Sequence, residues 1–313
     1  MQFIQHQQVI FSIISAIILF LYGLSGFSAE LKNTAGAKLE MVMRKLTANR
    51  FSAFFVGVIA TALIQSSTAV STIAMSLIDG GILSFQGAIS IMLGAYLGTT
   101  LTAWMVSFKL TGIGPFFIVI GSLISVVPWR LKIFGKALFY FGFIFFSLDL
   151  ISGALQPIRE SQYLADFLRY TDTTLKGILV GVVLTAIMQS SSVVIGLAII
   201  LVQQGILTPQ NSIPIMLGAT IGTTVTGLYA TWSMNRTAKK AAWCGTAINV
   251  VGVLLIYPFM EPFTEMVMTL APNENLVVAT AHLLYVVCLV AVFMIFLTPF
   301  VRIVGRIDNK LRD

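Results

Sequence analysis

Charged residues are scarce in this chain of 313 residues. Asp, Glu, Lys and Arg make up 10% of it, whereas an average soluble domain contains about 25%. Apolar residues make up 57%, and the mean hydropathy is +0.93. This composition excludes a soluble globular protein. The net charge of +7 comes from basic residues in short loops, as in membrane proteins, so no nucleic-acid partner is expected.

Cysteine and histidine are also rare, with two residues of each. Cys244 and Cys288 lie in apolar stretches, where we interpret them as small buried side chains. This placement argues against a disulfide, and the chain has no metal-ligand spacing, so no cofactor is expected beyond a coupling ion. His6 and His282 are distant in sequence from the polar clusters described below, and we interpret both as packing or interface residues.

Long apolar stretches are abundant, and each is long enough, or nearly so, to cross the hydrocarbon core of a bilayer. They lie near residues 9–27, 112–128, 137–155, 241–260 and 276–299. The first lacks a basic region before it and a convincing cleavage site, so we interpret it as a retained helix and not as a signal peptide. No soluble domain of useful size fits this composition, and residues 1–313 are interpreted as one membrane domain.

The chain contains an internal repeat. Residues 57–102 and 181–226 align without a gap at an offset of 124, and 24 of the 46 positions are identical. The repeats extend over about 9–128 and about 137–260. An extra helix at about 276–299 has no counterpart, and we expect it to contact lipid or another subunit. Repeated polar breaks in a membrane chain are typical of transporters built from two halves around one site.

Two polar clusters occur in each copy. The first reads Gln65-Ser66-Ser67-Thr68 and Gln189-Ser190-Ser191-Ser192. The second reads Gly94-Ala95-Tyr96-Leu97-Gly98-Thr99-Thr100 and Gly218-Ala219-Thr220-Ile221-Gly222-Thr223-Thr224. We expect the first cluster to form the turn of a helical hairpin. The glycines of the second predict a broken helix, with threonine oxygens beside the unwound stretch.

Loop charges predict the topology. Basic residues dominate the loops expected in the cytoplasm, which are 28–50, 129–136, 235–240 and 301–313. Loops with balanced or acidic charge are expected outside, and these are 156–176 and 261–275. Each loop falls on the side of the membrane that its charge predicts only if each hairpin is re-entrant, entering and leaving on the same side. The apolar segment after each hairpin must then cross the membrane once. Each repeat then makes three crossings, so the two repeats are inverted, with the N-terminus outside and the C-terminus in the cytoplasm.

The predicted fold class is therefore an all-α polytopic membrane protein. It contains two inverted-topology repeats, each with a re-entrant helical hairpin and a broken transmembrane helix, plus one extra C-terminal helix. Backbone at membrane depth must be hydrogen-bonded unless it lines a protein cavity, so the hairpin turns are expected to line a site.

The chemistry available at the clusters suits small ions. Helix N-termini favour anions and helix C-termini favour cations, while serine and threonine hydroxyls serve either charge. No Lys or Arg lies in any cluster. An anion held there must therefore be neutralised by helix ends and by bound cations, and this favours cation-coupled transport.

A purely structural explanation competes with this interpretation, because small residues also allow transmembrane helices to approach closely. Duplication of both clusters at a fixed offset favours the functional explanation, although we expect Thr102 and Thr226 to be structural. Four further polar residues have other expected roles. Glu30 and Asp149 are interpreted as helix-end residues, Asp79 as a turn residue, and Asn249 as a candidate polar contact with the core.

The paired motifs resemble those of the type II sodium–phosphate cotransporter family in its compact bacterial form, over roughly residues 15–260. The resemblance implies sodium-coupled phosphate uptake, and by analogy a homodimer with a moving core. Three positions depart from the pattern: Thr68 replaces a serine, and Tyr96 and Thr220 stand where asparagine is usual.

Candidate ligands follow from the motifs and the resemblance. The candidate phosphate ligands are Gln65, Ser66, Ser67, Thr68, Gln189, Ser190, Ser191 and Ser192. The candidate sodium ligands are Gln65, Ser66, Gln189, Ser190, Thr99, Thr100, Thr223 and Thr224. The implied location is the inner (cytoplasmic) membrane.

Three other functions compete with sodium–phosphate symport. Arsenate or another small oxyanion would fit the same hydroxyl-lined site. A passive channel needs a continuous wet path, whereas broken inverted hairpins suit alternating access. An intramembrane serine hydrolase needs a general base, and neither repeat core contains His or Lys. The chain is therefore not expected to be an enzyme.

Overall fold

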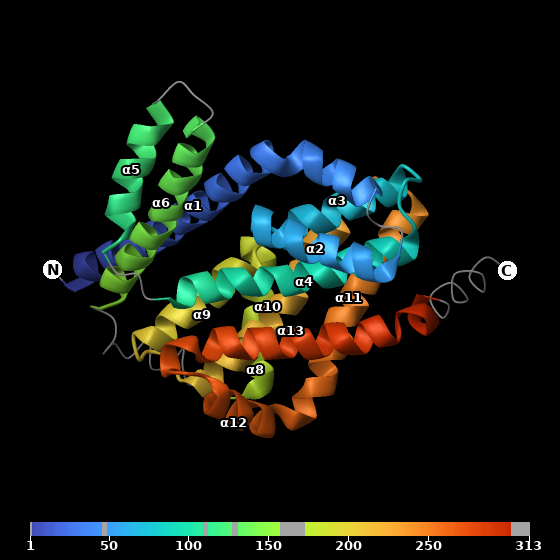
Figure 1. The fold of residues 1–313 in the computed structure, drawn as a ribbon. Coiled ribbons are helices and arrows are strands. Elements are labelled where there is room, and N and C mark those ends of the chain that lie inside the picture. Colours follow the sequence, from blue (N-terminus) through green and yellow to red (C-terminus); the bar gives the residue numbers. More distant parts are fainter. Residues whose placement is uncertain (1, 46–48, 109–111, 127–130, 157–172, 302–313) are drawn as a thin grey trace.

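The computed structural model describes residues 2–45, 49–108, 112–126, 131–156 and 173–301. Within these ranges the regular structure is entirely helical (Figure 1). The α-helices are α1 (Gln2–Lys45), α2 (Arg50–Ile64), α3 (Ser67–Asp79), α4 (Phe85–Ser107), α5 (Gly114–Val126), α6 (Leu131–Leu155), α8 (Thr174–Met188), α9 (Ser191–Gln203), α10 (Pro209–Ala230), α11 (Arg236–Ile256), α12 (Met260–Leu270) and α13 (Val277–Ile295). Short 3-10 turns at Tyr257–Phe259 and Glu274–Leu276 flank α12.

Among the described residues, six helical segments are long and apolar enough to cross a membrane, and the chain is an integral membrane protein. They are Gln8–Asn33, Phe85–Ser107, Phe134–Leu155, Pro209–Ala230, Arg236–Leu270 and Glu274–Ile295. Helices α2 and α8 have 15 residues each, and α3 and α9 have 13 each. At 1.5 Å per residue these helices reach about 20–22 Å, which is less than the roughly 30 Å of a hydrocarbon core.

The helix succession repeats along the chain. The first half contains α1, α2, α3, α4 and α5. The second half contains their counterparts in the same order, which are α6, α8, α9, α10 and α11. The contacts repeat too. A Cβ atom added to Gly57 would collide with the carbonyl of Ile91, and one added to Gly181 would collide with the carbonyl of Ile215. Both pairs are related by the offset of 124, so the sequence repeat is also a repeat of helix packing.

The second polar cluster does not break its helix, which corrects the sequence prediction. Helices α4 and α10 run without interruption through Gly94–Thr100 and Gly218–Thr224. The glycines serve close packing instead. A Cβ atom on Gly94 would overlap the carbonyl of Phe54 in α2, and one on Gly98 would lie 2.7 Å from the Cβ of Thr61. A residue without a side chain permits either unwinding or close approach, and here it permits close approach.

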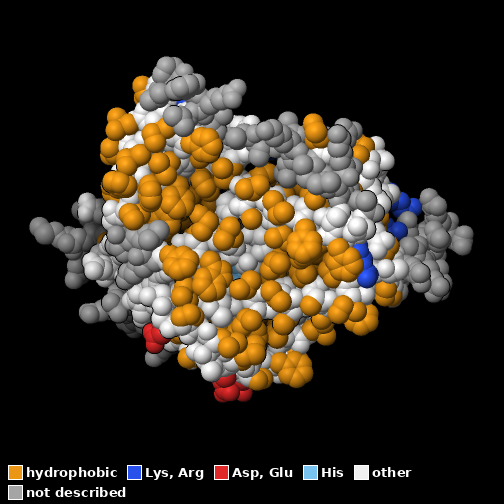
Figure 2. Space-filling model, viewed as in Figure 1, with side chains coloured by type: hydrophobic (Ala, Val, Ile, Leu, Met, Phe, Trp, Pro, Cys, Tyr) orange, Lys and Arg blue, Asp and Glu red, His pale blue; other side chains and the backbone are white. Residues whose placement is uncertain are grey.

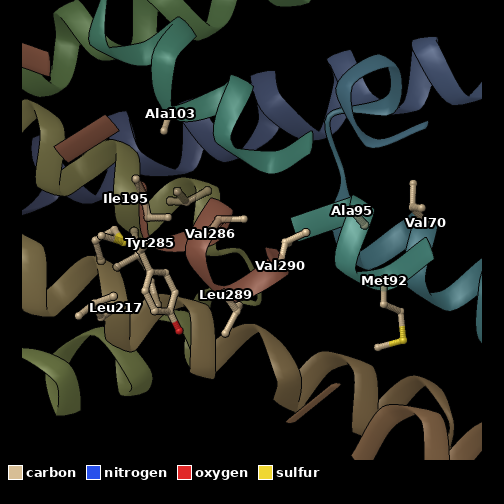
Figure 3. Packing of buried hydrophobic residues seen from close by; sticks show 14 of the residues in the cluster. Val70, Met92, Ala95, Ala103, Ile195, Leu217, Tyr285, Val286, Leu289 and Val290 are labelled. Carbon is tan, nitrogen blue, oxygen red and sulfur yellow. The ribbon is translucent and has the colours of Figure 1, made fainter. Parts of the chain in front are cut away.

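The C-terminal helix packs into the protein, and its expected contact with lipid or another subunit stays a prediction for its exposed side. Helix α13 packs against α4, α10, α9 and α11, and 67% of its most apolar window is buried inside the protein. In Figure 3 its residues Tyr285, Val286 and Leu289 lie among core side chains that include Ile195 and Leu217. The helix is part of the core. The predicted external loop 261–275 likewise contains α12, which buries Phe263 and Val267 while its other face stays exposed.

Helices α1, α5 and α6 form a group of their own beside the remaining helices (Figure 1). Helix α6 packs along both α1 and α5, whereas α1 makes fewer contacts with α2 and α3. Gly26 lets α1 approach the Tyr140 ring of α6, and Gly121 lets α5 approach the backbone of Phe139. Hydrophobic side chains cover much of the surface in Figure 2, as expected for a protein that faces lipid.

Candidate functional site

The two Gln-Ser pairs form nearly identical turns between helices. Gln65 ends α2 and Gln189 ends α8, with left-handed backbone angles φ of 57° and 54°. They are the only non-glycine residues with positive φ in the described part of the chain. A left-handed backbone costs a non-glycine residue about 1 kcal/mol or more. Two glutamines at positions that glycine would fill more easily indicate that the side chains themselves are needed.

The first turn is held by side-chain hydrogen bonds. The hydroxyl of Thr102 in α4 donates to Oε1 of Gln65 over 2.7 Å, and Nε2 of Gln65 donates to the carbonyl of Ala62 over 2.6 Å. Ser66 caps α3 by accepting a bond from the N–H of Ala69 at 3.2 Å. Gln65 is buried. The predicted structural role of Thr102 is therefore confirmed, because it fixes the glutamine of the turn.

The second turn lacks these bonds. Gln189 is exposed, and its side chain forms no hydrogen bond within the described part of the chain. Ser190 makes no side-chain cap to α9. Thr226, the repeat counterpart of Thr102, has a buried hydroxyl without a partner among the described residues. The donors of this turn are thus available to a ligand.

Both turns line one cavity of about 430 Å³, which we call the turn cavity. This volume lies in the range of small-molecule sites, about 300–1,000 Å³. Its lining residues are Leu24, Ser25, Ser28, Ala29 and Lys32 of α1, Gln65, Ser66, Ser67, Thr68 and Ala69 of the first turn, and Gln189, Ser190, Ser191 and Ser192 of the second. All eight residues predicted from the two Gln-Ser clusters are therefore brought together.

The N-termini of α3 and α9 open onto the turn cavity. Ser67 begins α3 and Ser191 begins α9, and both line the cavity. The first backbone N–H groups of a helix have no partner within that helix, and the helix dipole adds partial positive charge there. Two such ends beside several hydroxyls form an arrangement that can bind an oxyanion.

Two smaller cavities share lining residues with the turn cavity, and we call them the inner cavities. Their volumes are about 30 Å³ and about 20 Å³, and a cavity needs about 10–15 Å³ to hold one water molecule. Ser67 lines the turn cavity and both inner cavities, while Ser191 lines the turn cavity and the smaller inner one. Thr68 also lines the turn cavity and the larger inner one, so residues of both turns border a wide compartment and narrow ones sized for single waters or bare ions.

The four candidate sodium threonines are not equally placed. Thr99 lines the smaller inner cavity, Thr224 lines the larger, and Thr223 lines both. Thr100 lines none of the three, and its hydroxyl donates to the carbonyl of Leu97 over 2.7 Å. Thr99 and Thr223 also donate to their own helices, at 2.9 Å and 3.0 Å. A hydroxyl that donates in this way keeps lone pairs that can coordinate a cation.

Other elements complete the inner cavities. Asn249 of α11 lines both of them beside Tyr96, as expected for a polar contact with the core. His282 of α13 lines the smaller one, and its Nδ1 is buried without a partner among the described residues. The interpretation of His282 as a packing residue missed this position, because nothing in the sequence places α13 beside the clusters.

The charged residues that we assigned to helix ends and turns are linked by local contacts. The carboxylate of Glu30 pairs with Lys136 at 3.3 Å, and that of Asp149 accepts a bond from the N–H of Gly112 at 3.0 Å. Asp79 accepts from the N–H of Asn235 at 2.6 Å, which ties the end of α3 to the start of α11. None of the three lines the turn cavity or the inner cavities.

The contribution of α1 to the cavity was missed. Ser25, Ser28 and Lys32 follow one another at spacings of three and four residues, so they share one face of a helix. That polar stripe on an apolar helix was a signal in the sequence. Its meaning depended on knowing that this face of α1 meets the turns.

A bundle of apolar helices that encloses a polar cavity between two repeated turns is the arrangement of a membrane transporter for a small solute. The Na+/Pi-cotransporter family model matches residues 19–153 and 152–271. The chain belongs to this family, and membership implies transport of phosphate. The family is one of transporters and not of enzymes.

The chain is also similar to individual proteins, two of which carry names that refer to phosphate. The chain is 30% identical to the uncharacterized protein YqeW of Bacillus subtilis, over 95% of this chain and 97% of the relative. It is 26% identical to the putative inorganic phosphate export protein YjbB of Salmonella typhimurium, over 96% of this chain and 55% of that longer protein. It is 25% identical to the human sodium-dependent phosphate transport protein 2B, over 56% of this chain and 27% of that protein. No solved structure matches the chain.

Proposed function

We propose that this protein is a sodium-coupled transporter of inorganic phosphate that binds its anion between the two Gln-Ser turns. One observation carries the proposal: two helix N-termini and both turns line a single cavity. The proposed phosphate ligands are the backbone N–H groups and side chains of residues 65–68 and 189–192. These groups supply many hydrogen-bond donors but little net charge. Such a site can bind the anion from one side of the membrane and still release it on the other.

Sodium is proposed to bind behind the anion, in the inner cavities. Their linings offer hydroxyl and amide oxygens from Ser67, Thr99, Thr223 and Asn249 and contain no carboxylate. Oxygen ligands suit a hard cation, but without a carboxylate they leave its charge uncompensated. A phosphate at the turns would supply the missing negative charge, and this mutual stabilisation is the proposed basis of coupling.

Alternating access is proposed on the basis of two separate cavities. The turn cavity is bordered by α1, whereas a cavity of about 380 Å³ is bordered by α6, the repeat counterpart of α1. The second cavity contains Asp149, Gln203 and Gln204 but no residue of either turn. The turns thus line the cavity beside α1 and not the one beside α6, and the proposed transport step opens them toward α6.

The re-entrant hairpins and the inverted topology are part of the proposal. The short lengths of α2, α3, α8 and α9 support re-entrance. In Figure 2 most of the visible Lys and Arg side chains lie on the side of the view where α13 ends, and the visible Asp and Glu side chains lie away from it, which supports a cytoplasmic C-terminus. An inner-membrane location and a homodimer remain expectations. Reporter fusions at each terminus and the mass of the purified protein would test these expectations.

Radiolabelled phosphate uptake into sealed proteoliposomes tests the proposal. We expect saturable accumulation with an inward sodium gradient and none with equal potassium or choline gradients. Preloaded vesicles with the gradient reversed should lose phosphate, since gradients set the direction of a reversible carrier. Accumulation that ignores sodium would overturn the coupling. Folded protein that transports arsenate but not phosphate would replace the proposed substrate with another oxyanion.

A further inference from the structure

One face of α1 forms a wall of the turn cavity, and that face carries a charge. Leu24, Ser25, Ser28, Ala29 and Lys32 all line the cavity. Lys32 is the only charged side chain among the described residues that line it. The sequence clusters contain no Lys or Arg, so among the described residues Lys32 alone brings a full positive charge to the proposed anion site.

The charge of Lys32 has no counter-ion within the described part of the chain. The nearby carboxylate of Glu30 pairs with Lys136 of α6 instead. Lys32 itself is exposed, and none of the hydrogen bonds or ion pairs of the described residues involves it. The lysine therefore adds a net positive charge to a cavity that already contains two helix N-termini.

The helix packing that the two repeats share does not require the charge of Lys32. Three positions of α1 and α6 match at an offset of 119: Gly23 with Gly142, Ser28 with Ser147, and Glu30 with Asp149. The same offset pairs Lys32 with Ile151, which is fully buried. The helix packing that the two halves share thus works with an isoleucine at this position, and the lysine needs a separate explanation.

We propose that Lys32 is an anion-recognition residue at the turn cavity, attracting phosphate to the two turns and offsetting part of its charge. This inference deepens the proposed function and rests on it. Compartments lined by charge of one sign raise the local concentration of the opposite ion. Lys32 lies on α1, which packs with α6 and not mainly with the helices of the turns. We therefore expect it to act on the anion in the conformation in which the turns face α1.

Phosphate binding to the purified full-length protein at fixed sodium concentration tests this role. Lys32→Met keeps the length of the side chain and removes the charge, Lys32→Arg keeps the charge, and Lys239→Met removes an exposed charge that lines none of these cavities. We expect Lys32→Met to weaken phosphate binding by about three- to tenfold at low ionic strength. The other two variants should bind as the wild type does.

Screening distinguishes an electrostatic role from a structural one. Added choline chloride should reduce the difference between wild type and Lys32→Met, since charge interactions across solvent are screened within about 10 Å at 0.1 M salt. Equal phosphate affinity of the two proteins at low salt would overturn the proposal. If the wild type binds no phosphate at all, the proposed function fails instead, so the two failures are distinguishable.

A chemical switch of charge tests the same point in one folded protein. Lys32→Cys is made in a background with Cys244→Ala and Cys288→Ala, which removes both natural cysteines. A methanethiosulfonate reagent that adds an ammonium group should strengthen phosphate binding, and one that adds a sulfonate should weaken it further. The same effect from both reagents would show that only the bulk of the side chain matters, and would contradict the proposal.

Discussion

The two turns have the same backbone but different side-chain contacts. Gln65 and Gln189 adopt the same left-handed conformation at the ends of helices of equal length. Thr102 fixes the first glutamine, and Ser66 caps the following helix. The second turn has neither bond, although Thr226 and Ser190 supply the same chemical groups. One turn is thus prearranged, while the other retains unused donors that a bound anion could engage.

The comparison predicts where the repeats should respond alike. Gly94→Ala and Gly218→Ala should both prevent folding, because the added Cβ would overlap a backbone carbonyl of the neighbouring helix. Overpacking costs about 1–3 kcal/mol or more when backbone must move. Gly153→Ala is the matched control, since a Cβ there meets nothing within 4 Å. The yield of monodisperse protein checks this, and survival of either variant with wild-type stability would contradict the packing described here.

Replacing the turn glutamines separates function from stability. Gln65→Gly and Gln189→Gly should both reduce phosphate transport to background, because each removes a proposed ligand. Glycine relieves the left-handed backbone, so Gln189→Gly should unfold at an equal or higher temperature. The unfolding temperature of Gln65→Gly should not rise in this way, because the hydroxyl of Thr102 loses its hydrogen-bond acceptor. Transport and thermal unfolding are measured on the same preparations, and normal transport by both variants would exclude the turns as the site.

The threonine pair should respond unequally. Thr102→Val leaves Oε1 of the buried Gln65 without its donor and should cost about 1–3 kcal/mol of the free energy of unfolding. Thr226→Val removes a buried hydroxyl that has no partner in the described residues, so its effect on stability should be small or favourable. Thermal unfolding in detergent compares the two. Equal losses would mean that the two turns are held in the same way.

The serine caps should show the smallest difference. Ser66→Ala should cost about 1 kcal/mol, because Ser66 accepts a bond from the N–H of Ala69. Ser190→Ala should leave stability nearly unchanged, because it removes no cap. The same unfolding assay measures both variants. A larger loss from Ser190→Ala would reverse the proposed order of the two turns.

The sequence allowed accurate prediction of the turns because the signal was local and duplicated. A Gln-Ser pair inside two short apolar helices, repeated at one offset, predicts a break at a defined residue. The same signal predicted that the breaks line one site, since two repeats around a site bring their breaks together, and all eight cluster residues line the turn cavity.

Three features escaped prediction because they depend on neighbours distant in sequence. Glycine patterns do not distinguish an unwound helix from a close approach, and α4 and α10 proved continuous. Hydropathy does not distinguish lipid from protein as the partner of an apolar helix, and 67% of the most apolar window of α13 proved to be buried inside the protein. Lys32 became a candidate ligand only when the face of α1 was seen to line the turn cavity.

The central claim is that both turns bind one oxyanion, and an electron-dense analogue tests it directly. Crystals of the protein grown with sodium and arsenate would locate arsenic by its anomalous scattering. The account predicts a single arsenic peak in the turn cavity, within hydrogen-bonding distance of donors from both Ser66–Thr68 and Ser190–Ser192. A peak held by one turn alone, or one outside this cavity, would contradict the claim.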